Sequence, residues 1–146
     1  MNTTNTETMY PRMYALAKHL QCDISDISKA SYGDNVYEAD GDEYLVLTDN
    51  EANELAAKNI KESLWAFNAE FISSHTKHGF DDSQIAAIKE MQGRLCESAN
   101  SIIEALIVDL DHFIADAVSS DGRGHFIASY DSNEYEVGKF YIYQTN

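Results

Sequence analysis

Apolar residues between Ser101 and Ser119 recur with the period of an α-helix. At 100° per residue, the apolar side chains fall in one arc of roughly 160°, while the acidic and polar side chains fall outside it. The apolar set is Ile102, Ile103, Leu106, Ile107, Leu110, Phe113, Ile114, Ala117 and Val118. This pattern predicts one core helix with an acidic outer face.

Capping residues and shorter apolar stripes predict three further helices. They begin near Pro11, at Thr48 or Asp49, and at Asp82 or Ser83. The second of these is expected to run to about Ser74. Residues 1–8 are polar and are expected to form a flexible tail, which leaves residues 9–146 as a single domain.

The β-prone segments lie on either side of the helical region. Val36–Glu38 and Tyr44–Leu47 flank an Asp40-Gly41-Asp42 turn, which is typical of a hairpin. After Gly124 the chain becomes aromatic and β-prone again, from Phe126 to Tyr143. We therefore expect an α+β fold, in which long amphipathic helices pack on one face of a small antiparallel sheet.

The net charge narrows the range of possible functions more than the overall amino-acid composition does. Twenty-five acidic residues oppose ten basic ones, which gives a net charge of −15. Such a surface repels nucleic acid and anionic membranes and attracts a basic partner; the alternative is that the charge only maintains solubility. With no secretory signal or membrane-spanning run in the sequence, we expect a cytoplasmic protein that binds neither nucleic acid nor membrane.

Eleven acidic residues are candidates for a surface that binds a basic partner. They are Asp34, Glu38, Asp40, Asp42, Glu43, Asp49, Glu51, Glu54, Glu104, Asp111 and Asp116. Carboxylates held along a rigid surface can imitate nucleic-acid phosphates and so block a basic channel. The alternative is a solvated face, because turns and helix caps explain several of these acids without a partner.

A second group of candidates lies in and after the Gly122-Arg123-Gly124-His125 segment. This segment lacks the spacing of a phosphate-binding loop and is better explained as a helix stop. It would nevertheless display Arg123 and His125 beside the aromatic strands. Alternation along Phe140–Tyr143 places Tyr141 and Tyr143 on one side of the sheet, where tyrosines are favoured at interfaces.

The sequence contains only weak candidates for metal-binding and catalytic motifs. His75 and His78, followed by Asp81 and Asp82, could share a helix face and hold a transition metal. Histidine also suits a helix end, however, no His-Glu-x-x-His motif occurs, and the two cysteines lie elsewhere in the sequence. An EF-hand loop centred on Gly41 would need Val36 and Leu47 as ligands, which excludes it. No nucleophile elbow occurs, and Cys22 and Cys96 are expected to be buried free thiols. We therefore expect no metal, no cofactor and no catalytic residues.

Two stretches resemble small acidic proteins encoded by tailed bacteriophages and other mobile elements. They are the ESLWAFNAEF segment at 62–71, and the DGRGHF segment at 121–126 followed by YIYQTN at 141–146. The resemblance covers residues 44–146 and implies a phage accessory protein acting in the bacterial cytoplasm. Acidic accessory proteins of phages include inhibitors of restriction and CRISPR nucleases.

Charge and resemblance together suggest a non-enzymatic inhibitor of a host nucleic-acid-binding defence enzyme, of anti-CRISPR or anti-restriction type. It would act by nucleic-acid mimicry of the basic site. The alternatives are a homodimeric structural or regulatory module formed through the aromatic strands, and a metal-dependent enzyme.

Overall fold

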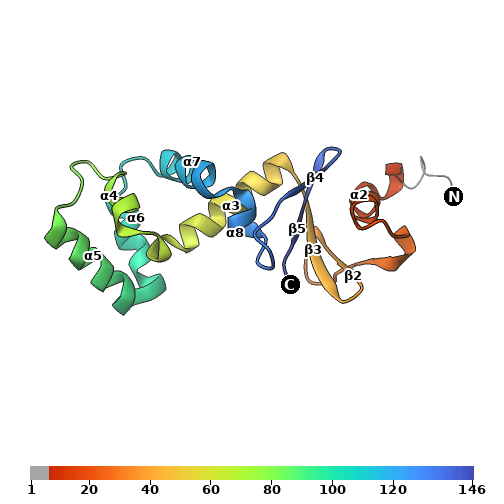
Figure 1. Ribbon diagram of the computed structural model, residues 1–146, viewed down its shortest axis with the longest axis horizontal. Helices are drawn as coiled ribbons and strands as arrows, with labels where there is room; N and C mark the ends of the chain where they lie inside the picture. The colour runs from red at the N-terminus through yellow and green to blue at the C-terminus, as the bar shows by residue number, and fades with distance from the viewer. Residues whose placement is uncertain (1–6) are drawn as a thin grey trace. The chain divides into compact units, whose positions relative to one another are not determined.

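The sheet in the computed structural model, which describes residues 7–146, has five antiparallel strands in the order β1-β2-β3-β5-β4 (Figure 1). The strands are β1 (Ile27–Lys29), β2 (Val36–Ala39), β3 (Asp42–Thr48), β4 (Tyr135–Val137) and β5 (Phe140–Gln144). The predicted α+β class and antiparallel sheet are confirmed. β2 and β3 form the predicted hairpin, in which Asp40 and Gly41 have φ values of 52° and 83°, as a type I′ turn requires.

The C-terminal strand β5 lies inside the sheet. It pairs with β3 from Tyr44↔Gln144 to Thr48↔Phe140, and with β4 through a two-residue loop between Val137 and Phe140. The predicted combination of the early hairpin with C-terminal strands is therefore correct.

The segment after Asp121 differs from the prediction. We expected a strand at Phe126 and Ile127, but residues Arg123–Ile127 form helix α8. Gly122, with φ 84°, turns the chain and allows a new helix to begin. Gly124 is buried where a Cβ atom would lie 2.5 Å from the backbone oxygen of Ser132, so the helix packs more closely here than a side chain would allow.

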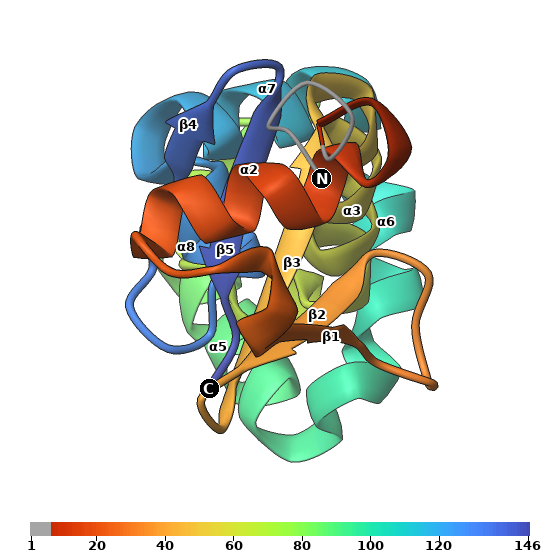
Figure 2. The same ribbon diagram turned by 90° about the vertical axis from the view of Figure 1, so that its right-hand side faces the viewer.

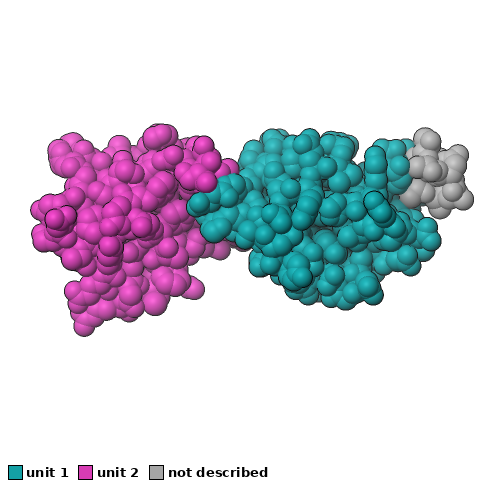
Figure 3. Space-filling model, in the orientation of Figure 1, with its two compact units in different colours: residues 1–56, 121–146 teal, residues 57–120 magenta. Residues whose placement is uncertain are grey.

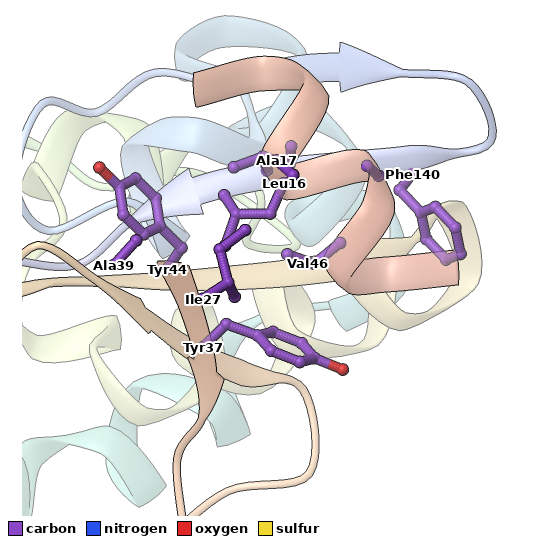
Figure 4. Packing of buried hydrophobic residues seen from close by; sticks show 10 residues of the cluster. Leu16, Ala17, Ile27, Tyr37, Ala39, Tyr44, Val46 and Phe140 are labelled. Atoms are coloured by element: carbon purple, nitrogen blue, oxygen red, sulfur yellow. The ribbon is translucent and has the colours of Figure 1, made fainter. Parts of the chain in front are cut away.

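Helix α2 (Pro11–Leu20) covers one face of the sheet (Figures 2 and 4). It begins at the predicted proline and contributes Leu16, which is fully buried against Val46 and Ile142. The start of helix α3 (Asp49–Glu62) and helix α8 lie across the opposite face. Helices therefore cover both faces of the sheet, whereas the prediction placed them on one.

Residues 57–120 are mostly helical. They contain the last turns of α3, followed by η2 (Leu64–Ala66), α4 (Ala69–Ser73), α5 (Asp82–Leu95), η3 (Cys96–Ala99), α6 (Asn100–Leu106) and most of α7 (Leu110–Asp121). Their core contains the fully buried side chains of Ile60, Leu64, Ile72, Ile103 and Phe113.

The predicted helix from Ser101 to Ser119 is broken into α6 and α7. At the break, Ile107 is extended and bridges to Thr76, and the Val108 amide donates to the carbonyl oxygen of His75 at 2.9 Å. Because the break changes the helical phase, the predicted apolar arc does not face one core. Phe113 is fully buried, but Ile102 is 44% exposed.

The long helix predicted to reach Ser74 ends at Glu62. The side chain of Asn100 explains this end, since its Nδ2 donates to the carbonyl oxygen of Glu62 at 2.7 Å and its Oδ1 accepts from the amide of Trp65 at 2.8 Å. A distant asparagine therefore satisfies backbone groups that would otherwise continue the helix.

Two compact units lie within the predicted domain (Figure 3). Unit 1 comprises residues up to 56 together with 121–146, and unit 2 comprises residues 57–120. The single domain over 9–146 stays a prediction. The predicted flexible tail, residues 1–8, mostly lies outside the described residues, but residues 7 and 8 are helical rather than irregular.

Candidate functional site

Four carboxylates gather at the end of the β2–β3 hairpin, and we call Glu38, Asp40, Asp42 and Glu43 the hairpin acids. The I′ turn holds Asp40, while the ladder places Glu38 directly opposite Glu43 and Asp42 opposite Ala39. None of the four makes an ion pair within residues 7–146, where ion pairs involve only six of the 25 acids. The hairpin acids therefore form a rigid group of uncompensated charge.

The Glu38–Glu43 pair is destabilising in isolation, because like charges directly opposite on adjacent strands repel. Tyr32 partly offsets this repulsion, since its hydroxyl oxygen lies 3.1 Å from Glu38 Oε1 and also hydrogen-bonds Glu43. The hydroxyl of Thr145 donates to Glu43 Oε1 at 2.6 Å. These two hydrogen bonds lower the pKa of Glu43, so its charge is favoured in the folded protein.

The other side of the hairpin borders a groove of about 650 Å³, lined by three carboxylates and a largely apolar wall. The carboxylates are Asp26, Asp40 and Asp42. Burial, together with the nearby Asp26 and Asp23, raises the pKa of the Cys22 thiol in this groove. Cys22 is therefore kept protonated and does not have the environment of a nucleophile.

Two of the predicted surface acids have structural roles instead. Glu51 forms two hydrogen-bonded contacts with Arg12, at 2.7 and 3.0 Å, and its Oε1 accepts from the Thr48 amide at 2.7 Å. Asp49 Oδ1 pairs with Arg123 Nη1 at 2.7 Å. The predicted cap at Thr48 or Asp49 is confirmed, because α3 begins at Asp49 and the Glu51 amide donates to Thr48 Oγ1 at 3.3 Å. Asp49 nevertheless keeps 62% of its side chain exposed.

The remaining predicted acids are divided between the two units. Asp34 and Glu54 are exposed in unit 1, and Glu104 and Asp111 are exposed in unit 2. In unit 2, Asp116 Oδ2 contacts His75 Nε2 at 2.8 Å. Unit 1 has fifteen acids against five bases and unit 2 has ten against five, so their net charges are −10 and −5 and most of the excess negative charge belongs to unit 1, which contains the hairpin.

Arg123 and Tyr143 do not lie on an open surface, contrary to the prediction. The Arg123 side chain is only 11% exposed, because it pairs with Asp49 and Glu134. Its guanidinium carbon lies 4.5 Å from the centre of the Tyr141 ring. Tyr143 is fully buried and its hydroxyl donates to Glu134. These contacts hold α8 against α3 and the sheet.

Tyr141 and His125 differ in their accessibility. Tyr141 is half-buried beneath the Arg123 guanidinium, whereas His125 is exposed on α8 with its ring packed against Phe126. Because β5 is paired on both edges, it offers no free backbone to a second copy of the chain.

The predicted histidine pair does not come together in one site. The side chain of His75 is 5% exposed and is held by Asp116, while His78 is exposed. Over the described part of the chain, no three His, Cys, Asp or Glu side chains are grouped so that they could hold a metal ion. Cys96, expected to be buried, is exposed at the C-terminal end of α5.

Two residues that complete the acidic site were not assigned to it from the sequence. Tyr32 is 65% exposed in the loop before β2, and Thr145 follows β5. Neither belongs to a motif, because only the register of β2, β3 and β5 brings them to Glu43.

Comparison of the chain with known protein families, curated proteins and solved structures finds no match. Within residues 7–146, every helix is too short or too polar to cross a membrane.

Proposed function

We propose that this protein is a non-enzymatic phage accessory protein that inhibits a host nucleic-acid-binding defence enzyme of the CRISPR or restriction type. It would act in the bacterial cytoplasm and occupy the enzyme's basic site in place of nucleic acid. The observation that carries the proposal is the group of hairpin acids, which is held by the strand register, is exposed to solvent at Asp40 and Asp42, and forms no ion pair within residues 7–146.

The Glu38–Glu43 register supports a role in binding rather than in stability. Like charges in direct register lower stability, and the fold reduces this cost with two hydroxyl contacts instead of a basic residue. A lysine opposite Glu38 would stabilise the hairpin but would neutralise part of the surface. A functional surface that opposes stability is a recurrent trade-off in proteins.

The geometry also suits the phosphate-binding sites of nucleic-acid enzymes. Arginine and lysine side chains in such sites normally meet phosphates at closely spaced positions along a strand. Glu38 and Glu43 are opposite each other on adjacent strands, where paired side chains lie about 5 Å apart, and Asp40 and Asp42 border the groove on the other side of the hairpin. The Tyr32 ring, next to two carboxylates, adds a flat surface on which an arginine can stack.

The test compares two full-length variants of equal charge. In the hairpin variant, Glu38 and Glu43 become glutamine, and Asp40 and Asp42 become asparagine. Asn is well tolerated at the left-handed position of Asp40. The control variant neutralises four exposed acids elsewhere in the chain through Glu62→Gln, Asp82→Asn, Glu97→Gln and Asp121→Asn.

Each protein is immobilised, exposed to bacterial lysate at increasing salt, and then challenged with duplex DNA or with RNA. We expect the wild-type chain and the control to retain the same nucleic-acid enzyme, to release it on addition of nucleic acid, and to inhibit its activity. The hairpin variant should lose both retention and inhibition. Equal retention and inhibition by the two variants would contradict the proposal, as would an enzyme that binds nucleic acid and this protein simultaneously.

A further inference from the structure

A second groove in unit 1 has the opposite electrostatic character to the hairpin acids. It lies between one face of α2 and the β4–β5 loop, and its volume is about 420 Å³, within the range of small-molecule sites. Its lining includes Glu7, Tyr14, Lys18, Val137, Lys139 and Phe140.

The two lysines set this groove apart within a strongly acidic unit. Unit 1 has five basic residues, and two of them, Arg12 and Arg123, are engaged in ion pairs. Lys18 and Lys139 make no ion pair within residues 7–146, yet both line this one groove. The groove therefore combines two lysines that form no ion pair within residues 7–146, in a unit whose other charges are mostly negative.

The backbone holds both lysines in place. Lys18 is in the last turn of α2, one turn after Tyr14 and Ala15 on the same helix face. Lys139 is the second residue of the tight β4–β5 loop, which is fixed by the Val137↔Phe140 pair and by a φ of 61° at Gly138. Neither position depends on a long flexible loop.

Apolar and aromatic side chains form part of the groove wall beside the lysines. Phe140 forms part of the wall, and its ring lies 5.5 Å from Lys139 Nζ and 5.3 Å from the guanidinium carbon of Arg12. Tyr14 and Val137 are half-buried and leave part of their surface to the groove. Such a lining suits the body of an organic molecule better than a hydrated inorganic ion.

We propose that this groove binds a small organic anion. Its carboxylate or phosphate head would contact Lys18 and Lys139, and its aromatic or aliphatic body would pack against Tyr14 and Val137. The carboxylate of Glu7 at the groove limits the charge that the site accepts, which favours a head of one or two negative charges. This site is separate from the hairpin acids and does not depend on the function proposed above.

The test uses the ¹⁵N-labelled full chain titrated with phenyl phosphate, benzoate and inorganic phosphate. We expect the two organic anions to cause saturable amide shifts centred on residues 11–18 and 137–140, and inorganic phosphate to bind more weakly. Whichever organic anion binds more tightly identifies the preferred head group. Inorganic phosphate binding as tightly as phenyl phosphate, or no saturable shift up to about 10 mM ligand, would overturn the proposal.

Charge-matched variants locate the site. Lys18→Gln with Lys139→Gln should weaken binding by about tenfold or more. Lys29→Gln with Lys58→Gln removes two other lysines that form no ion pair with any described residue, and it should leave binding within about twofold of wild type. Equal weakening by both double variants would show that only net charge matters and would overturn the assignment.

Discussion

Replacing Glu51 by glutamine tests an electrostatic contact that joins α2, the end of β3 and the start of α3. The carboxylate receives two contacts from Arg12 and one from the Thr48 amide. The same Arg12 Nη1 also donates to the carbonyl oxygen of Val46 at 2.7 Å. The substitution keeps the size of the side chain and removes its charge, so any loss of stability reports on the ion pair and the charged cap.

The pKa of Glu51 gives an upper limit for this loss. Hydrogen bonds from Arg12, which outweigh the opposing effect of burial, lower the pKa from 4.5 to about 2. At 1.36 kcal/mol per pH unit, this difference corresponds to at most about 3 kcal/mol. Because the two side chains are 24% and 33% exposed, solvent screens part of the interaction, and we expect a loss of about 1.5–2 kcal/mol.

The sign of the pH dependence follows from the lowered pKa. Glu51 contributes its full stabilisation above pH 4.5, the value for the unfolded chain, and loses it as the pH falls towards about 2. Urea unfolding of wild type and Glu51→Gln should therefore show a constant difference between about pH 7 and 5, and a difference reduced by roughly half or more at about pH 3.

Glu54→Gln is the matched control, because Glu54 is exposed on the same helix and makes no ion pair in the described part of the chain. We expect it to change stability by less than about 0.5 kcal/mol. A loss for Glu51→Gln that is as large at pH 3 as at pH 7 would refute the electrostatic explanation. A loss below about 0.5 kcal/mol at pH 7 would refute the magnitude.

Three further substitutions separate the roles of other residues. Arg123→Lys should lower the free energy of unfolding by about 1–3 kcal/mol, measured by thermal unfolding, because an ammonium cannot contact two acids and stack on a ring at the same time. Measured by urea unfolding, Phe113→Ala should lower the free energy of unfolding by about 3–5 kcal/mol, because Phe113 is fully buried, and Ile102→Ala should lower it by less than about 1 kcal/mol, because Ile102 is 44% exposed. Equal losses for the two variants would contradict the break between α6 and α7. Glu38→Gln should leave stability unchanged or raise it by about 0.2–1 kcal/mol while weakening capture of the proposed enzyme, and a clear loss of stability would argue against repulsion with Glu43.

The sequence was sufficient to predict the elements whose boundaries are set by contacts between residues close together in the chain. The Asp40-Gly41 turn, the proline at the start of α2 and the cap around Thr48 all involve residues within a few positions of one another. Each therefore gave a correct prediction of an element or its boundary.

Long-range contacts decided the features that were predicted incorrectly. Asn100 ends the helix at Glu62 from 38 positions away, and the pairing of Ile107 with Thr76 interrupts the apolar period at 31 positions. The spacing of apolar residues along a helix carries no information about contacts with residues far away in the sequence. A prediction from periodicity alone therefore gave single helices where the structure has separate ones.

At the candidate site, too, features set by local contacts could be predicted and features set by long-range contacts could not. The hairpin acids were recognisable because turn and strand residues lie close together in sequence. The internal roles of Asp49 and Arg123 were not, because the two residues lie 74 positions apart and meet only in the folded chain. A count of acids cannot distinguish a charge that is paired inside the fold from one that is displayed to a partner.

The position of β5 has a consequence for how the chain acquires its structure. Unit 2 is one continuous segment, whereas the sheet of unit 1 needs residues 140–144 to fill the place between β3 and β4. During synthesis the helical segment can therefore form its contacts while β3 still presents an unpaired edge. Exposed strand edges promote association with other chains, and pairing over so long a sequence separation is intrinsically slow. Aggregation during expression should consequently begin at β3, and a chain cut before residue 140 should aggregate even if its helical segment folds normally.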